Sequence, residues 1–297
     1  MAEIRRDKRV PRGSSRQDPT HPLLSRRRFL ARTLAAGFAL AVRPIAASTI
    51  RTGTAGLREG EVSFSSGGTR IPAYRALPEG AGPFPVVLLV HEIFGLHEYV
   101  RDVARRLARE GYYALAPDLF ARQGDPRRLA SIPEIVEKIV RRVPDAQVLS
   151  DLDAAVAWLD GLPEARTASL GITGFCWGGR IVWLYAAHSE RLDAGVAWYG
   201  RLVGEPSDTT PKHPVDVVGA LRAPVLGLYG GKDPGIPLET VDRMREELRK
   251  FAKPSEIVVY PEAPHGFHAD YRPSYRKEAA EDGWRKMLDW FRKHGVG

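Results

Sequence analysis

The sequence predicts a single α/β domain in which helices cover both faces of a mostly parallel sheet. Short apolar, β-branched runs such as PVVLLV (85–90) are continuous rather than alternating, as expected for strands buried on both faces. These runs alternate along the chain with segments of helical periodicity, an order that favours parallel strand pairing. No linker or internal repeat divides the chain beyond its N-terminal leader, so we expect one domain over residues 55–297.

The elements of this domain are expected in the following order. Residues 61–77 alternate around Ser-Gly-Gly and predict a hairpin. After the strand that begins at residue 85, residues 98–111 have helical periodicity and end at a glycine. Further strands are expected at 112–120, 168–176, 194–200, 223–233 and 255–263, and further helices at 145–160, 180–188, 238–251 and 276–294. The stretch 201–222 contains three prolines and no clear period, and it predicts a surface loop or partial lid.

Residues 1–48 have the pattern of an export signal. A basic cluster precedes a short apolar run at 34–42, and small residues at 46–48 mark the expected cleavage region. The segment SRRRFL (25–30) resembles the twin-arginine signal, so we expect the twin-arginine export machinery to carry the folded protein to the periplasm or outside the cell. The apolar run is about half of the roughly 20 residues that span a bilayer, so no stable membrane anchor is expected. The alternative is a disordered basic tail.

The charge distribution limits the class of partner. The formal net charge of +8 is carried entirely by residues 1–48, and the rest of the chain is neutral. The domain therefore has no general electrostatic attraction for nucleic acid, and we expect a small-molecule substrate. The chain has one cysteine, which excludes an internal disulfide. We expect a monomer.

The cysteine lies in GITGFCWGGR (171–180), between an expected strand and an expected helix. A nucleophile elbow requires this arrangement, because the apex residue is strained and side chains two positions away would collide across the turn. The helix N-terminus that follows also favours a thiolate over a thiol. Cys176 is therefore the candidate nucleophile. The alternative is that it is simply a small buried apolar residue.

Two further candidates follow in the order that elbow hydrolases use, first an acid and then a histidine. The segment expected as a strand at 223–233 ends at Asp233, in a turn, and His265 lies in the loop after the next strand. Asp233 before Pro-Gly could instead be only a turn residue, and His268 competes with His265 for the role of base. His188 and His213 lack such a position and are expected at the surface. For the oxyanion hole we expect the backbone N–H groups of Trp177 and Ile93.

The motifs HEIFG, APDLFARQ, GFCWGG, YGGKDPGIP and PHGFHADYRPSY resemble those of the dienelactone hydrolase family in order and approximate spacing, over residues 58–296. The resemblance implies an α/β-hydrolase fold and hydrolysis of small lactones and esters without metal or other cofactor. It also implies a Cys176–His265–Asp233 triad and an acyl-enzyme thioester. Glu92 would control the protonation of the thiol, and Arg122 would bind a substrate carboxylate. The alternative for Glu92 is a simple loop salt bridge.

One position departs from the family pattern. Dienelactone hydrolases carry a second carboxylate-binding arginine four residues after the catalytic histidine, and this chain has Ala269 there. Arg272 is a candidate substitute. The departure and the expected export both put dienelactone itself in doubt as the substrate. Two other functions are considered: a non-catalytic hydrolase-like protein that binds a ligand, and a redox protein in which Cys176 cycles through sulfenic acid.

Overall fold

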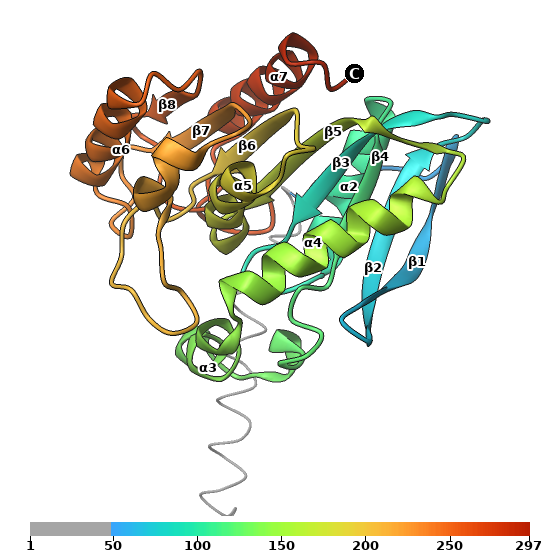
Figure 1. The fold of residues 1–297 in the computed structure, drawn as a ribbon, viewed down its shortest axis with the longest axis horizontal. Coiled ribbons are helices and arrows are strands. Elements are labelled where there is room, and N and C mark those ends of the chain that lie inside the picture. Colours follow the sequence, from blue (N-terminus) through green and yellow to red (C-terminus); the bar gives the residue numbers. More distant parts are fainter. Residues whose placement is uncertain (1–48) are drawn as a thin grey trace, which may run out of the picture.

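The computed structural model describes residues 49–297 (Figure 1). Within this range the chain forms one eight-stranded sheet in the order β1-β2-β4-β3-β5-β6-β7-β8. From β4 to β8 the strands are parallel, and β1 and β2 add an antiparallel hairpin at one edge. The predicted leader at 1–48, with its export signal and cleavage region, lies outside the described residues.

The strands confirm the predicted pattern. They are β1 (Leu57–Ser66), β2 (Thr69–Pro78), β3 (Phe84–Val90), β4 (Tyr113–Pro117), β5 (Ala165–Phe175), β6 (Ala194–Trp198), β7 (Val225–Gly230) and β8 (Glu256–Tyr260). The hairpin turns at Gly67 and Gly68, whose φ values of 53° and 75° are those that glycine adopts without strain. The residues of β4, β6 and β7 are all buried, as expected for strands covered on both faces.

The helices lie on both faces of the sheet. They are α2 (Glu98–Arg109), α3 (Ile132–Lys138), α4 (Asp145–Asp160), α5 (Trp177–His188), α6 (Leu238–Lys250) and α7 (Lys277–Lys293). In Figure 1, α4 and α5 lie in front of the sheet, and α2 lies behind it. No helix in the range 49–297 is long and apolar enough to cross a membrane.

Two parts of the chain differ from the sequence-based expectation. The helix α3 was not predicted; Ser131 caps its N-terminus by accepting a hydrogen bond from the N–H of Glu134. The segment 201–222 is only partly a surface loop, because Pro214–Ala220 forms a 3₁₀-helix whose Val218 is fully buried. The expectation that His213 lies at the surface is wrong: its side chain is buried, and its Nε2 lies 3.2 Å from the carbonyl oxygen of Glu205.

The parallel strands bring distant parts of the sequence to one edge of the sheet. Residues that follow β3, β5, β6, β7 and β8 all lie beyond carboxyl ends, which meet at the same edge in a parallel sheet. Those positions include Glu92, Cys176, Tyr199, Asp233 and His265. The candidate site is built from these residues.

Candidate active site

Cys176 occupies a forced turn between β5 and α5. Its φ of 56° and ψ of −113° are unusual for a residue with a side chain, and it is the N-cap of α5. A Cβ added to Gly174 would lie 2.5 Å from the carbonyl oxygen of Gly178, and one added to Gly178 would lie 2.4 Å from that of Val90. Only glycine permits these close approaches, which explains the glycines around the single cysteine.

His265 and Asp233 meet beyond the ends of β8 and β7. Nδ1 of His265 lies 2.6 Å from Oδ2 of Asp233, and Oδ1 of Asp233 accepts a hydrogen bond of 2.8 Å from the N–H of Gly235. The Asp233 side chain is almost fully buried, whereas His265 is partly exposed toward the site. Asp233 is therefore more than a turn residue, because both of its oxygens are used and one of them orients the imidazole.

The imidazole of His265 also interacts with Cys176. Burial lowers the pKa of His265, but the negative charge and hydrogen bonding of Cys176 and the contact with Asp233 raise it to about 10. Cys176 and Asp233 therefore favour the protonated imidazole, as expected for a base that accepts a proton. The structure therefore places His265 between Cys176 and Asp233, which is the arrangement of a hydrolase triad.

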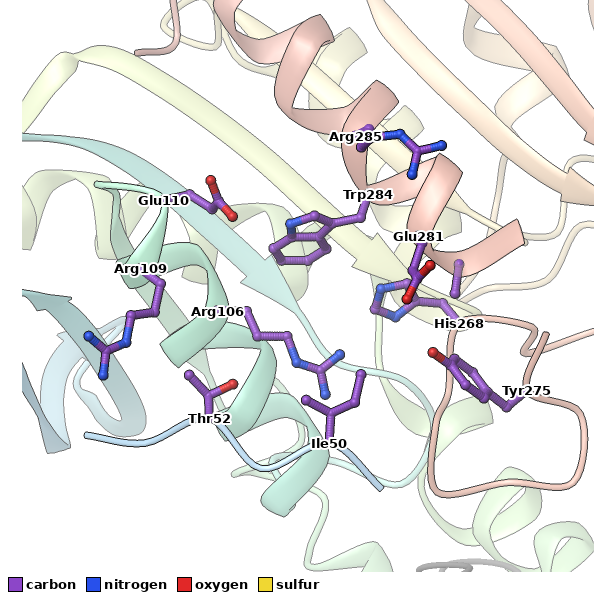
Figure 2. Close-up of a pocket in the computed structure, with 11 residues that line it drawn as sticks. Ile50, Thr52, Arg106, Arg109, Glu110, His268, Tyr275, Glu281, Trp284 and Arg285 are labelled. Atoms are coloured by element: carbon purple, nitrogen blue, oxygen red, sulfur yellow. The ribbon is translucent and has the colours of Figure 1, made fainter. Parts of the chain in front are cut away.

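His268, the competing histidine, is directed elsewhere. Its Nδ1 lies 2.6 Å from the hydroxyl of Tyr99, and its ring stacks on that of Trp284 at 5.8 Å between centroids. It lines a separate cavity of about 440 Å³ beside α2 and α7, together with Arg106 and Trp284 (Figure 2). Burial lowers the pKa of His268 well below its usual range, and no aspartate contacts its ring among the described residues. The geometry favours His265 as the base.

Glu92, two residues beyond the end of β3, is a buried carboxylate. Its Oε1 accepts a hydrogen bond from the hydroxyl of Tyr271 and lies 3.5 Å from Nε2 of His97. Burial raises the pKa of Glu92, but His97, Arg272 and Tyr271 outweigh burial and hold it below its ordinary value. Its other oxygen, Oε2, has no hydrogen-bond partner among the described residues. An unpaired buried carboxylate oxygen is costly, which favours a functional position over a simple loop salt bridge.

The two candidate arginines have different surroundings. The guanidinium of Arg122 donates hydrogen bonds of 2.6 and 2.9 Å to the two carboxylate oxygens of Asp151 on α4. It also donates to the carbonyl of Ser66. This pairing occupies its guanidinium, so the structure does not favour its predicted role in binding a carboxylate. Arg272 is half-buried and forms no ion pair within residues 49–297.

The guanidinium of Arg272 lies at the site. It lies over the ring of Phe94 at 5.7 Å, and its Nη1 would lie 3.2 Å from a Cβ at Gly266, the residue after His265. Burial lowers the pKa of Arg272, but the negative charges of Glu92 and Cys176 are among the interactions that raise it above its usual value. The guanidinium of Arg272 therefore stays positively charged beside the triad, where it could bind an anionic group of a substrate.

The predicted oxyanion-hole donors both lie in turns beyond strand ends. Trp177 is the first residue of α5, where the N–H groups have no partner in the helix. Ile93 lies in the turn after β3, and its N–H forms no hydrogen bond with another described residue. The structure brings both turns to the carboxyl edge of the sheet. Their role in holding an oxyanion stays a prediction.

Sequence reasoning did not find two tyrosines at the site. Tyr271 binds Glu92, and Tyr199 packs its ring against that of His265 at 5.2 Å between centroids. Tyr271 belongs to the quoted motif PHGFHADYRPSY, but its spacing says nothing about a contact with the strand end at residue 92. Only the position of Tyr199 near the C-terminal end of the strand predicted at 194–200 could have drawn attention to it.

The sheet order, the strained cysteine turn and the histidine–aspartate pair together define a protein of the α/β-hydrolase class. A profile of the dienelactone hydrolase family matches residues 71–295. The chain therefore belongs to this family, and it is a hydrolase of the ester and lactone class.

Individual relatives agree with this assignment. A protein of Methylorubrum extorquens named "Putative carboxymethylenebutenolidase" is 62% identical over 274 residues, which cover 92% of this chain and 94% of its own. A protein of the same name from Escherichia coli K12 is 51% identical over 267 residues, covering 90% and 98%. The crystal structure of a "Putative Dienelactone Hydrolase" from Klebsiella pneumoniae matches with a TM-score of 0.79 and 56% identity, covering 80% of this chain and 99% of that one. These matches confirm the predicted fold.

Proposed function

We propose that the protein hydrolyses small esters or lactones through a thioester formed on Cys176, with His265 as base and Asp233 as its orienting partner. The arrangement of Cys176 is the observation that carries this proposal: its sulfur is presented by a strained turn to an imidazole whose far nitrogen lies 2.6 Å from a buried carboxylate. The activity in the names of the close relatives, cleavage of a butenolide lactone, supports the same reaction class.

The reaction follows from this geometry. The thiol proton passes to Nε2 of His265, and the thiolate attacks the carbonyl carbon to form a tetrahedral oxyanion, which the N–H groups of Ile93 and Trp177 hold. The C–O bond of the ester or lactone then breaks, and the imidazolium gives its proton to the leaving alkoxide. His265 next removes a proton from water, whose oxygen attacks the thioester. Collapse of this second intermediate releases the carboxylic acid and restores the cysteine.

The two other candidate functions are less well supported. A non-catalytic binding protein has no need of a strained nucleophile or of a histidine oriented by a buried aspartate. A redox thiol is resolved most simply by a second cysteine, and the chain contains none. Turnover of an ester, measured beside peroxide consumption, separates all three functions.

We further propose that the preferred substrates carry an anionic group and that Arg272 binds it. In the Arg272→Gln variant we expect kcat/KM for a carboxylate-bearing lactone to fall about 10- to 100-fold, since a charge-assisted hydrogen bond contributes about 1.5–3 kcal/mol. The value for a neutral ester such as p-nitrophenyl acetate should change much less. Steady-state kinetics with both substrates give the ratio of the two kcat/KM values in the parent protein and in the variant.

The exposed Arg276, four residues further on, donates only to backbone carbonyls, so Arg276→Gln is the matched control. An equal loss on the neutral and the anionic substrate in Arg272→Gln would contradict anion binding, because such a loss would reflect only the influence of Arg272 on Glu92 and Cys176.

We also propose that residues 1–48 direct export through the twin-arginine pathway. Replacing Arg26 and Arg27 by lysine should leave the protein in the cytoplasm, because that pathway requires the arginine pair. Cell fractionation followed by immunoblotting measures the distribution. Unchanged recovery of the variant in the periplasm would rule out this route.

A further inference from the structure

Tyr199 and Cys176 form a pair of strained residues at adjacent strand ends. The parallel register joins Phe175 of β5 to Trp198 of β6, so Cys176 and Tyr199 are the next residues along both strands. Both have positive φ values, 56° and 37°, and in the range 49–297 only one other non-glycine residue, Ala252, shares this property. Such a conformation costs about 1–3 kcal/mol for a residue with a bulky side chain.

The surrounding backbone holds Tyr199 in this conformation. Its N–H donates to the carbonyl of Leu228 at 2.8 Å, and the carbonyl of Trp198 accepts from the N–H of Cys176 at 3.0 Å. A Cβ on Gly200 would lie 2.3 Å from the backbone of Gly179, so the Tyr199 turn is pressed directly against the first turn of α5. The position of the tyrosine is therefore fixed relative to the cysteine.

The hydroxyl of Tyr199 is buried and unused. The side chain is fully buried, and the hydroxyl has no hydrogen-bond partner among the described residues. Leaving a buried polar group unpaired costs about 1–3 kcal/mol. Burial raises the pKa of Tyr199 well above its ordinary value, and the charges of Glu92 and Cys176 act in the same direction. The phenol is thus a donor that keeps its proton, and its ring packs at 5.2 Å between centroids against that of His265, the residue that also interacts with the sulfur.

We propose that the hydroxyl of Tyr199 donates a hydrogen bond to the Cys176 thiolate. This inference rests on the proposed cysteine nucleophile and adds a further residue to its machinery. When the thiol gives its proton to His265, the negative charge left on Sγ gains a partner, and the tyrosine keeps its own proton. When Sγ bonds to the acyl carbon, the hydrogen bond is released; it forms again when water cleaves the thioester.

An unpaired donor in the resting protein is consistent with this role. In the resting structure this donor makes no hydrogen bond with Sγ, but its backbone is already held beside Cys176, so only a rotation of the side chain is needed when charge develops on the sulfur. The strained backbone places the donor, and the buried position keeps competing water away from it. The stabilised thiolate is also a better leaving group in the second half of the reaction.

The test uses the fact that Cys176 is the only cysteine of the chain, so alkylation by iodoacetamide reports on this thiol alone. In Tyr199→Phe, which keeps the ring, we expect the midpoint of the alkylation rate against pH to rise by about one unit or more. We expect kcat to fall about 10- to 100-fold with little change in KM, as for loss of a hydrogen bond to a charged group. The matched control is Tyr112→Phe, which removes a buried hydroxyl bonded to the carbonyl of Val296; it should move neither quantity.

Three results would overturn the inference. One is an unchanged alkylation midpoint in Tyr199→Phe. Another is an alkylation midpoint that is the same in Glu92→Gln and in the Glu92→Gln, Tyr199→Phe double variant. The hydroxyl would then act on the sulfur through the carboxylate of Glu92. The third is a fall in melting temperature or a failure to fold, because removing an unpaired hydroxyl should leave stability equal or higher. Failure of the proposed function is distinguishable, since it would appear as hydrolysis that survives in Cys176→Ala.

Discussion

Replacing Cys176 by alanine is expected to lower kcat for esters and lactones by about four orders of magnitude or more, which corresponds to about 5 kcal/mol of activation free energy. The sulfur is the only atom in the proposed site that can form the covalent intermediate, and the remaining groups supply only oxyanion stabilisation and binding. Hydrolysis of p-nitrophenyl acetate and of simple lactones by the purified protein measures the effect.

Alanine keeps the Cβ of cysteine, so the backbone strain of the positive φ at this position is the same in the variant and in the parent protein. Melting temperature should therefore change little, and a folded but inactive variant is the expected result. Thioester formation can be followed separately by mass spectrometry after rapid mixing with an activated ester, and the adduct should be present in the parent protein and missing in the variant. Turnover that continues unchanged in folded Cys176→Ala would remove the basis of the mechanism.

The sequence was sufficient for the parallel sheet and for the main residues of the site, for reasons that are local. A strand buried on both faces has a continuous apolar run, and a turn too tight for side chains requires glycine at fixed positions around Cys176. Asp233 and His265 could be proposed because each directly follows such a run, and the ends of parallel strands meet at one edge.

What the sequence could not provide depends on contacts between distant elements. The pairing of Arg122 with Asp151 joins a loop to α4, and nothing in either segment predicts the other. The burial of His213 has the same origin, since a polar residue in an aperiodic stretch has no local pattern that shows what will cover it. The unused hydroxyl of Tyr199 is harder still to predict, because it is defined by the absence of a partner in the folded state.

Replacing Asp233 by asparagine is expected to lower kcat by about 10³- to 10⁴-fold while preserving the fold. The N–H of Gly235 holds Oδ1 in place at 2.8 Å, so the amide oxygen of asparagine must remain there and its NH₂ group must face His265. An NH₂ group can only donate to Nδ1, which forces the proton onto Nε2. His265 then presents a donor to the thiol and cannot accept its proton. Steady-state kinetics measure the loss, and Asp242→Asn, at an exposed carboxylate on α6 that pairs with Arg245, is the matched control.

The same substitution should change how stability depends on pH. The folded-state pKa of His265 is raised from 6.5 to about 10, so its stabilising contribution is fully present below about pH 6.5 and is lost as the pH rises toward 10. Asp233 supplies part of that shift through its hydrogen bond and charge. In Asp233→Asn the folded-state pKa falls toward its ordinary value, so the loss of stability between pH 6.5 and 10 should be smaller than in the parent protein. Urea unfolding at both pH values compares the two proteins, and an identical loss in both would show that Asp233 does not hold the proton on His265.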